Sequence, residues 1–246
     1  KTISGNLIIE KYFDIKKIFF SSRNYNFLKF PFDINSISFF SKIINHNINQ
    51  INIKPYKLII LDCDNTLWGG VLDEDKSSEI FYSNQNKGLN FKKFQTIIKE
   101  LKNKGFILSL CSKNNEKKVW HFMRKRKMIL QKRDFVLSKI NWNEKSENIS
   151  QIVKSLDLRF EDCIFIDDNI VEINKVKNQI KKINVLHAKY IKKTIQDISK
   201  DDRFKKLIIS KDDAKKFNQY KLRSKFTRYV ENEKIEPHLI KSLKQK

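Results

Sequence analysis

Three short apolar segments, each ending in a cluster of polar residues, constrain the fold of this chain more than any other feature. They span residues 58–61, 106–110 and 163–166, and none of them contains a charged residue. Between them, apolar residues recur at helical spacing over 91–101 and 149–156. Continuously apolar strands that alternate with amphipathic helices are typical of a parallel sheet covered on both faces. The pattern predicts an α/β fold with a central parallel sheet between two layers of helices.

Each apolar segment runs into polar residues at its carboxyl end. The clusters are Asp62-Cys63-Asp64, Cys111-Ser112-Lys113-Asn114-Asn115 and Asp167-Asp168-Asn169. In a parallel sheet these ends lie along one edge, where ligands bind in open α/β folds. Ionised carboxylates at a buried edge require a cation or hydrogen bonds, and Mg2+ takes one or two carboxylates together with phosphate oxygens. The clusters therefore predict a magnesium site that handles phosphate.

The pair Asp62 and Asp64 indicates the type of chemistry. One carboxylate of such a pair can attack phosphorus while the other moves the proton. Ser112, at the tip of the second segment, can hold a phosphoryl oxygen. Lys145 stands just ahead of the second helix, where its ammonium and the helix N-terminus can both face an anion. The two aspartates of the third cluster can complete the metal shell.

These four elements, in the order Asp-x-Asp-x-Thr, Ser, Lys and Asp-Asp, resemble the haloacid dehalogenase (HAD) superfamily of phosphohydrolases. Over residues 23–243 the chain also resembles the FkbH-like group, HAD subfamily IIIC. That resemblance is carried by LDCDNTLWGGV at 61–71, CSKNN at 111–115, Asn141-Trp142 with Lys145, and FIDDN at 165–169. It implies a HAD-like Rossmannoid three-layer α/β/α core.

FkbH-like proteins are associated with removing phosphate from 1,3-bisphosphoglycerate, an acyl phosphate, and loading its glyceryl group onto the phosphopantetheine thiol of an acyl carrier protein. The resemblance implies a Mg2+-dependent phosphatase and acyltransferase that uses aspartate-based phosphoryl transfer. Its partners would be an acyl carrier protein and a phosphorylated small-molecule acyl donor. The setting would be a secondary-metabolite or surface-glycan pathway in the cytoplasm.

The family's roles can be carried over to the matching residues of this chain. Asp62 would be the nucleophile and Asp64 the general acid/base, while Ser112 and Lys145 would bind phosphoryl oxygens. The metal ligands would be Asp62, the backbone carbonyl of Asp64, Asp167 and Asp168, and which of the last two binds stays open. Candidates for touching substrate or shaping the loops are Asn65, Thr66, Trp68, Gly69, Lys113, Asn114 and Asn169.

The chain departs from the family pattern in several places. Cys63 replaces the usual Leu, Ile170 and Ile173 stand where the family has Pro and Arg, and the acidic turn reads DEDK at 73–76. None of these changes removes a core catalytic group, although they leave the substrate less defined. Family members also have a fuller N-terminal α/β region and a further C-terminal segment, so the resemblance predicts that this chain is a fragment.

The spacing of the motifs predicts a site without a cap domain. Only 25 positions separate Thr66 from Phe91, and 22 separate Lys145 from Asp167. These intervals have room for a small hairpin, or for one helix and one strand, but not for an inserted domain. An open site suits a bulky or carrier-tethered substrate, because a partner protein can itself exclude water.

Cys111 is a candidate to carry the acyl group as a thioester. A thiolate beside Ser112 would be favoured by Lys113. Strand alternation works against the idea, because Cys111 should point away from the site if Ser112 points into it. The chain has only 3 cysteines, all widely spaced, which favours a reduced protein over a disulfide framework or a zinc site.

The expected organisation has three parts. Residues 1–55 would be the remnant of an N-terminal α/β region, with a helix over 36–48. Residues 56–190 would form the catalytic core, and residues 191–246 a basic helical segment that leads to a missing domain. No run of the sequence reaches the ~18 consecutive apolar residues that a membrane-spanning helix needs.

The charge of the chain leaves alternative functions open. It contains 51 Lys and Arg against 28 Asp and Glu, a net charge of +23, which is compatible with nucleic acid or acidic partners. Only 8 of the basic residues are Arg, the side chain that reads phosphates best, so nucleic acid is disfavoured. The alternatives are a plain HAD phosphatase acting on a protein or phospho-sugar, and a basic binding module that keeps the fold without catalysis.

Overall fold

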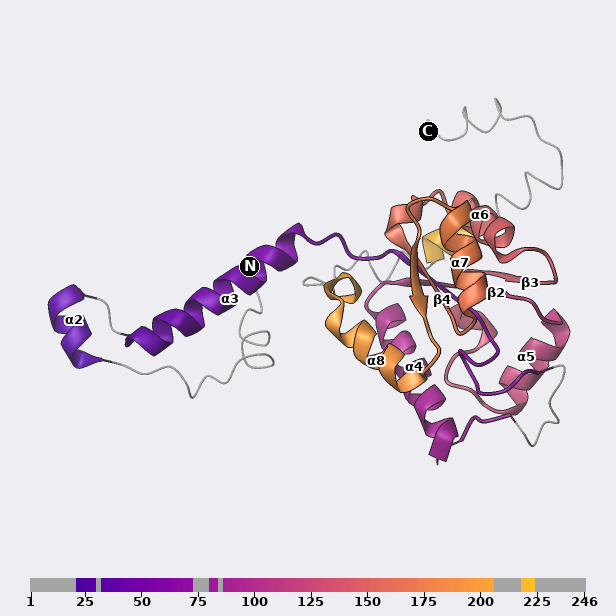
Figure 1. Cartoon of the computed structure of the whole chain (residues 1–246), viewed down its shortest axis with the longest axis horizontal. Helices are drawn as coiled ribbons and strands as arrows, with labels where there is room; N and C mark the ends of the chain where they lie inside the picture. Colours follow the sequence, from indigo (N-terminus) through magenta and orange to yellow (C-terminus); the bar gives the residue numbers. More distant parts are fainter. Residues whose placement is uncertain (1–20, 30–31, 73–79, 84–85, 206–217, 224–246) are drawn as a thin grey trace, which may run out of the picture. The chain divides into compact units, whose positions relative to one another are not determined.

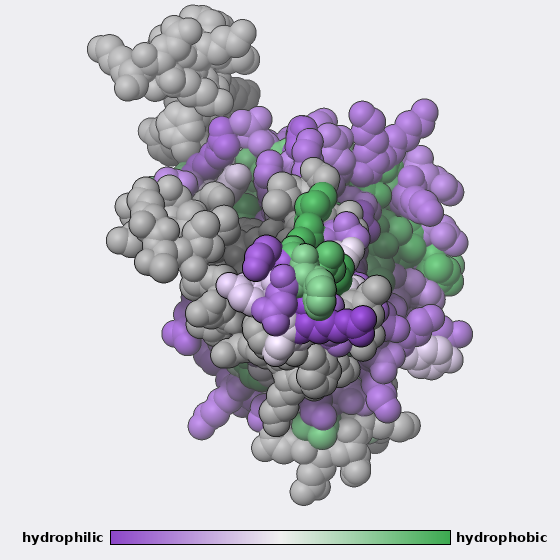
Figure 2. Space-filling model, turned by 90° about the vertical axis from the view of Figure 1, so that its left-hand side faces the viewer, coloured by the Kyte–Doolittle hydropathy of each residue, from purple (hydrophilic) through white to green (hydrophobic). Residues whose placement is uncertain are grey.

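The computed structural model describes residues 21–29, 32–72, 80–83, 86–205 and 218–223. They belong to two compact units, residues 1–54 and 55–246. None of the helices within the described ranges has an apolar stretch long enough to cross a membrane. Hydrophilic residues make up most of the coloured surface on the face drawn in Figure 2, as the high lysine content requires.

In the described residues of the first unit, two helices begin at side-chain caps. Before α2 (Ser22–Leu28), the hydroxyl of Ser21 accepts a hydrogen bond of 3.2 Å from a backbone amide of the first turn. Before α3 (Ile34–Asn52), the carboxylate of Asp33 accepts one of 2.7 Å in the same way. The helix predicted over 36–48 lies within α3, which extends it at both ends.

The second unit contains a five-stranded parallel sheet with the strand order β3-β2-β1-β4-β5 (Figure 1). The strands are β1 (Leu58–Leu61), β2 (Ile107–Ser112), β3 (Leu137–Ile140), β4 (Cys163–Asp167) and β5 (Asn184–His187). β1 lies at the centre, where Leu58 is paired with Ile107 of β2 and with Cys163 of β4. The three predicted strands are therefore the three inner strands of the sheet.

Helices cover both faces of this sheet. They are α4 (Asn86–Asn103), α5 (Glu116–Lys125), α6 (Lys145–Ser155), α7 (Ile170–Gln179) and α8 (Ile191–Lys200), with short 3-10 helices η2 (Lys132–Asp134), η3 (Phe160–Asp162) and η4 (Asp202–Phe204). Alternate residues of β1 point to opposite faces. Ile59 and Leu61 join a hydrophobic cluster with α4, α5 and α8, whereas Leu58 and Ile60 join one with α6 and α7. The predicted three-layer α/β/α fold is confirmed.

Two intervals of the chain bear on the expected absence of a cap. Between Lys145 and Asp167 the chain forms only α6, η3 and β4, so no domain is inserted there. After β1 the described residues form a turn and a bridge that pairs Gly69 with Phe81, while residues 73–79 and 84–85 lie outside the described part.

The carboxyl-terminal part of the second unit is described only in places. α8 packs on α4 within the layered unit, although the expected core ends at 190. Residues 218–223 are helical, and Tyr220 packs against the cluster under α6 and α7. The rest of the expected C-terminal helical segment lies outside the described residues.

Candidate active site

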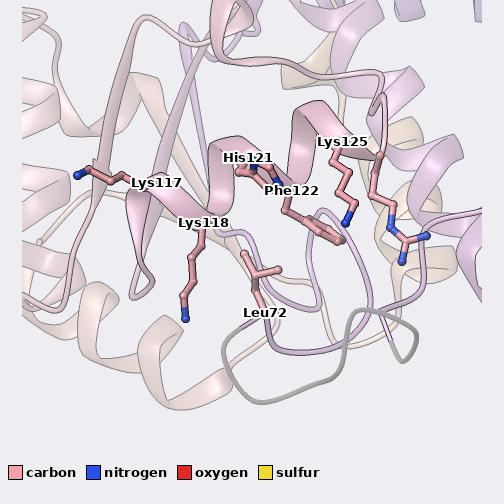
Figure 3. A pocket seen from close by; sticks show the side chains of 7 residues that line it. Leu72, Lys117, Lys118, His121, Phe122 and Lys125 are labelled. Carbon is pink, nitrogen blue, oxygen red and sulfur yellow. The ribbon is translucent and has the colours of Figure 1, made fainter.

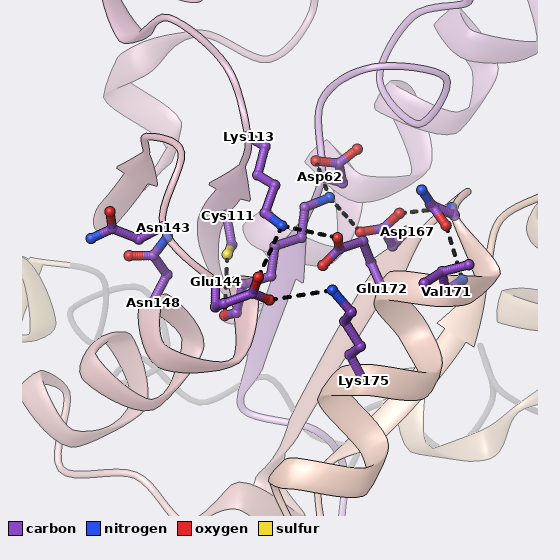
Figure 4. A network of polar contacts seen from close by, with 12 residues as sticks. Asp62, Cys111, Lys113, Asn143, Glu144, Asn148, Asp167, Val171, Glu172 and Lys175 are labelled. Atoms are coloured by element: carbon purple, nitrogen blue, oxygen red, sulfur yellow. Dashed lines mark hydrogen bonds and ion pairs between the residues drawn. The ribbon is translucent and has the colours of Figure 1, made fainter.

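The carboxyl ends of the inner strands bring the predicted site residues together. Asp62 directly follows β1, and its amide donates a hydrogen bond of 3.0 Å to the carbonyl of Ile166 in β4. Ser112 ends β2, Asp167 ends β4, and Lys145 is the first residue of α6. The sheet topology therefore brings residues that lie tens of positions apart in the sequence together at one edge of the sheet (Figure 4).

Lys145 lies between two carboxylates. Its Nζ is 2.9 Å from Asp62 Oδ1 and 2.6 Å from Asp167 Oδ2, and all three side chains are buried. Burial lowers the pKa of Lys145, but the two carboxylates outweigh it and raise that pKa above its usual value. The ammonium is thus held charged in the interior.

Asp62, Asp167 and Asp168 form a cluster that could hold a metal ion. Each offers a carboxylate oxygen, and these oxygens lie within 4.8 Å of one another. Burial and the charge of Asp62 raise the pKa of Asp167, and the same two causes raise the pKa of Asp168 to about 6. Hard oxygen donors with an excess of negative charge suit a divalent cation such as Mg2+.

Asp64 is held by three N–H donors. The indole of Trp68 (2.8 Å) and the backbone amide of Leu72 (3.1 Å) donate to its Oδ1, and the side-chain amide of Asn114 (2.8 Å) donates to its Oδ2. Burial raises the pKa of Asp64 to about 6 and the charge of Asp62 contributes, while the amide of Leu72 opposes the shift. Its carboxyl group can therefore gain or lose a proton near neutral pH.

The turn after β1 contains two residues with positive φ angles, and both are of types that tolerate this conformation. Asn65 has a φ of 51° and its side-chain oxygen accepts a hydrogen bond of 2.8 Å from the amide of Gly70, which itself has a φ of 102°. Gly69 is constrained by space, because a Cβ there would lie 2.8 Å from the ring of Phe91. Thr66 and Trp68 are fully buried, so both lie beneath the surface of this turn.

A pocket of about 200 Å3 opens among these residues. It is lined by Asp62, Asp64, Asn65, Val71, Ser112, Lys113, Lys145, Asp168, Asn169 and Glu172. Asn169 also caps α7, since its side chain accepts a hydrogen bond of 2.9 Å from the amide of Val171. The predicted residues that do not line it are Thr66, Trp68, Gly69, Cys111, Asn114 and Asp167.

Lys113 connects the pocket to two glutamates that the sequence analysis did not identify. Its Nζ lies 3.1 Å from Glu172 in α7 and 3.6 Å from Glu144, which in turn lies 3.8 Å from Lys175 (Figure 4). Glu172 is in the first turn of the helix that follows Asp167-Asp168-Asn169. The first turn of a helix that follows a strand lies near the sheet edge where ligands bind. The place of Glu172 in that turn was therefore the signal in the sequence that could have identified it.

His187 is a third residue that the sequence analysis did not identify. Its Nε2 lies 2.8 Å from the backbone carbonyl of Asp168, and its backbone pairs with Asp167 in the ladder between β4 and β5. The imidazole therefore helps to fix the loop that carries two of the candidate metal ligands. His187 is 19 residues away from Asp168 in the sequence, so no local sequence motif links it to the site.

Cys111 points away from the pocket. Its thiol donates a long hydrogen bond of 3.6 Å to the backbone carbonyl of Lys145 and lies in the hydrophobic cluster under α6. Burial raises the pKa of Cys111 far above its usual value, although the charge of Lys145 opposes this. Cys63 and Cys163 are also buried. A thioester at Cys111 would require α6 to move aside.

Comparison with known proteins places this fold. No family model matches the chain, and no curated protein matches it. Among solved structures, it is similar to the N-terminal part of the protein BF1531 from Bacteroides fragilis, which contains a phosphatase domain complexed with Mg. The identity is 32% and the TM-score 0.54 over 73% of this chain. The match covers 48% of the other chain, so this chain spans about half of its length.

Two other solved structures match at lower similarity. One is 3-deoxy-D-manno-octulosonate 8-phosphate phosphatase from Moraxella catarrhalis, in complex with magnesium, phosphate and KDO, with 17% identity and a TM-score of 0.35 over 53% of this chain and 68% of the other. The second is the HAD domain of the effector protein Lem4 from Legionella pneumophila, with 14% identity and a TM-score of 0.38 over 59% of this chain and 94% of the other.

Proposed function

We propose that this chain, which has the fold of the HAD phosphatases, is a Mg2+-dependent enzyme in which Asp62 accepts a phosphoryl group. The observation that carries the proposal is the buried ammonium of Lys145, 2.9 Å from Asp62 and 2.6 Å from Asp167. A fixed cation beside a carboxylate nucleophile stabilises the charge that develops on a transferring phosphoryl group. The structure from Bacteroides fragilis, whose phosphatase domain is complexed with Mg, supports the same chemistry.

Phosphoryl transfer proceeds in two steps. In the first, an oxygen of Asp62 attacks phosphorus, the bond from phosphorus to the leaving oxygen breaks, and Asp64 gives its proton to that oxygen. In the second, water attacks the phosphorus of the aspartyl phosphate and Asp64 takes a proton from the water. Inorganic phosphate and free Asp62 result. Lys145 and Ser112 hold the other phosphoryl oxygens throughout.

The carboxylates of Asp62, Asp167 and Asp168 would hold the Mg2+ ion together with the backbone carbonyl of Asp64. When bound, the ion offsets negative charge on the phosphoryl oxygens and lets two anions approach each other. The close carboxylate oxygens, with the burial and mutual repulsion that raise the pKa of Asp167, fit such a cation.

The finer part of the proposal is the reaction of the FkbH-like proteins, which ends with a glyceryl group on an acyl carrier protein. It rests on the resemblance over 61–71, 111–115 and 165–169. The absence of an inserted domain between Lys145 and Asp167 supports it, because a substrate tethered to a protein needs an open approach.

Loading a glyceryl group from 1,3-bisphosphoglycerate requires two bonds to break. The ester phosphate leaves when Asp62 attacks its phosphorus and Asp64 protonates the departing alkoxide. The acyl phosphate leaves when the carrier thiol attacks the carbonyl carbon, so that a C–S bond forms, the C–O bond to phosphate breaks, and the thiol proton departs with the phosphate. Only the first of these events uses Asp62 as a nucleophile.

The test is to incubate the full chain with Mg2+, 1,3-bisphosphoglycerate and a phosphopantetheinylated carrier protein, and to follow free phosphate and the intact mass of each protein. We expect phosphate release and a glyceryl adduct on the carrier, both dependent on Mg2+. Asp62→Asn should abolish the release of the ester phosphate, whereas Asp157→Asn, a change at an exposed aspartate, should not.

The outcomes separate the two parts of the proposal. Phosphate release without an adduct would overturn the acyl transfer and favour a plain phosphatase. If no phosphate is released from 1,3-bisphosphoglycerate, from a phosphoprotein or from a phosphorylated sugar, the phosphotransfer itself is refuted, and the basic binding module becomes the better account of the chain.

A further inference from the structure

A groove beside the active site combines an apolar floor with a basic rim. It has a volume of about 820 Å3 and is lined by Leu72, Lys117, Lys118, His121, Phe122, Lys125 and Arg126. Figure 3 shows Lys118, Phe122 and Lys125 extending from α5 on the side where Leu72 lies. We propose that this groove is the docking site for an acidic helix of a partner protein. The inference rests on the proposed function for the partner's role as acyl carrier.

The rim and the floor come from the periodicity of α5. Lys118, Phe122 and Lys125 stand at positions i, i+4 and i+7, so they share one face of the helix. Phe122 is nearly buried and packs edge-on against Trp68, with ring centroids 5.2 Å apart. Leu72 is partly buried against the same cluster. An aliphatic side chain of a partner would meet carbon on the floor and ammonium groups at both ends.

The charge of the groove calls for an anionic partner. The described residues that line it include three lysines, Lys117, Lys118 and Lys125, and one arginine, Arg126. None of the described lining residues is an aspartate or a glutamate. Within the described ranges, neither Lys117 nor Lys125 makes an ion pair. Lysines elsewhere in the unit do pair, as Lys113 does with Glu172 and Lys102 with Asp134. Opposite charge on a partner would steer its approach and fix its orientation.

The groove adjoins the side chains that hold the catalytic acid. The backbone amide of Leu72 donates to Asp64, and Trp68, on which Phe122 packs, donates to the same carboxylate. A protein docked here sits next to the turn that carries Asp64. Its tethered arm would reach the pocket across this turn, because Leu72 lines the groove and Val71 lines the pocket.

An acidic helix fits these features better than nucleic acid does. Single strands bind to platforms of exposed aromatic rings on which bases stack, but Phe122 is nearly buried and packs edge-on against Trp68 inside the molecule. A helix with glutamates spaced at i and i+4 around one leucine would match the lysines of the rim and the carbon floor at once.

The test measures binding without any substrate. The probe is a fluorescein-labelled acidic peptide of about 16 residues, long enough to form a helix, with one central leucine, and its binding is followed by fluorescence anisotropy. A peptide with every Glu replaced by Gln is the comparison. We expect the full chain to bind the acidic peptide at least about tenfold more tightly, with affinity falling as salt rises.

A matched pair of variants distinguishes the groove from the overall charge. Lys118→Glu with Lys125→Glu changes the third and tenth residues of α5, and Lys193→Glu with Lys200→Glu changes the third and tenth residues of α8, a helix of the same length. The α5 pair should raise the dissociation constant about tenfold or more, whereas the α8 pair should change it less than about twofold. Circular dichroism is to be used to check that both variants fold.

Several results would overturn the inference. If the α5 pair and the α8 pair weaken peptide binding equally, the binding depends on net charge and not on the groove. If a single-stranded RNA oligomer binds more tightly than the acidic peptide, the groove is assigned to nucleic acid. Tighter peptide binding after Asp73, Glu74 and Asp75 are all changed to amides would assign it to the chain's own segment. A chain that releases phosphate but binds no peptide refutes the docking alone, and one that binds peptide but releases no phosphate refutes the proposed function alone.

Discussion

The ammonium of Lys145 lies 2.6 Å from the carboxylate of Asp167, and both side chains are buried. The same ammonium is 2.9 Å from Asp62, and Asp168 completes a cluster of three carboxylates. Three carboxylates and one ammonium leave an excess of two negative charges when all are ionised. One bound Mg2+ ion would neutralise that excess.

Replacing Lys145 by Met should impair both catalysis and folding. We expect the rate of phosphate release to fall about 100-fold or more, because a fixed positive charge at the phosphoryl group is lost. Without Mg2+, the free energy of unfolding should fall by about 3 kcal/mol, since two buried carboxylates lose their partner. Added Mg2+ should raise the melting temperature of this variant more than that of the wild type.

Lys154→Met provides the control for this experiment, because Lys154 is an exposed residue in the last turn of the same helix. It should leave phosphate release and the response to Mg2+ unchanged. Phosphate assays and urea denaturation with and without Mg2+ give all the values. An unchanged response to Mg2+ in Lys145→Met would contradict the account of the charge cluster.

Trp68→Phe removes one of the three donors to Asp64 while keeping an aromatic ring in the core. Because Asp64 keeps its bonds from Leu72 and Asn114, we expect kcat for phosphate release to fall about tenfold, which corresponds to one hydrogen bond to a charged group. Trp120→Phe is the matched control, since its indole donates to the exposed Glu116 of the same helix. Equal effects of the two substitutions would argue against an orienting role for Trp68.

Cys111→Ala should leave acyl transfer and phosphate release within about twofold of the wild type, because Cys111 lies in the core with its thiol kept protonated by burial. A thiol reagent should modify none of the three cysteines in the native chain and all of them after unfolding, as mass spectrometry can measure. Loss of acyl transfer in Cys111→Ala, with phosphate release intact, would revive the thioester.

Asp134 should contribute to stability in a pH-dependent way. Its buried carboxylate accepts hydrogen bonds from Lys99 and, at 2.8 Å, from Lys102. These bonds lower the pKa of Asp134, although burial opposes them. The stabilisation is therefore complete above the unfolded-state pKa of about 3.9 and is lost as the pH falls through the lower folded-state pKa.

We expect Asp134→Asn to lower the free energy of unfolding by about 2 kcal/mol at pH 7, with a difference from the wild type that shrinks as the pH is lowered below about 4. Asp157→Asn, at an exposed pair with Arg223, should cost less than about 0.5 kcal/mol. Urea denaturation at several pH values measures both. A difference that stays constant down to pH 2 would contradict the assignment.

The inner strands could be predicted from the sequence and the edge strands could not. Residues 58–61, 107–112 and 163–167 are buried along their whole length, and continuous burial leaves a continuous apolar run. β3 has two half-buried residues at its centre and β5 is half-buried throughout. Edge strands have fewer neighbours and are more exposed, so their sequences contain polar residues. These polar residues interrupt the apolar run by which a strand can be recognised.

The candidate site follows the same division. Asp62, Ser112 and Asp167 stand directly at the ends of predicted strands, and strand ends converge in any parallel sheet. Glu172 and His187 reach the site from the first turn of α7 and from an edge strand, positions that depend on how those elements pack. Gly69 was predicted to touch substrate or shape the loop, and in the structure the ring of Phe91 is what excludes a side chain there.

The pairing of β1 with a strand on each side has a consequence for the motions of the site. The amides of Leu58–Leu61 should exchange with solvent only when the whole unit unfolds, because both edges of that strand are closed. The turn that carries Asp64 lies outside this ladder, and it is held by its own backbone hydrogen bonds, such as that of 2.7 Å from the amide of Leu67 to the carbonyl of Cys63, and by the side-chain bonds to Asp64. The nucleophile is thus fixed to the central strand of the ladder, while the orientation of the proton donor depends on hydrogen bonds made within the turn and from Asn114.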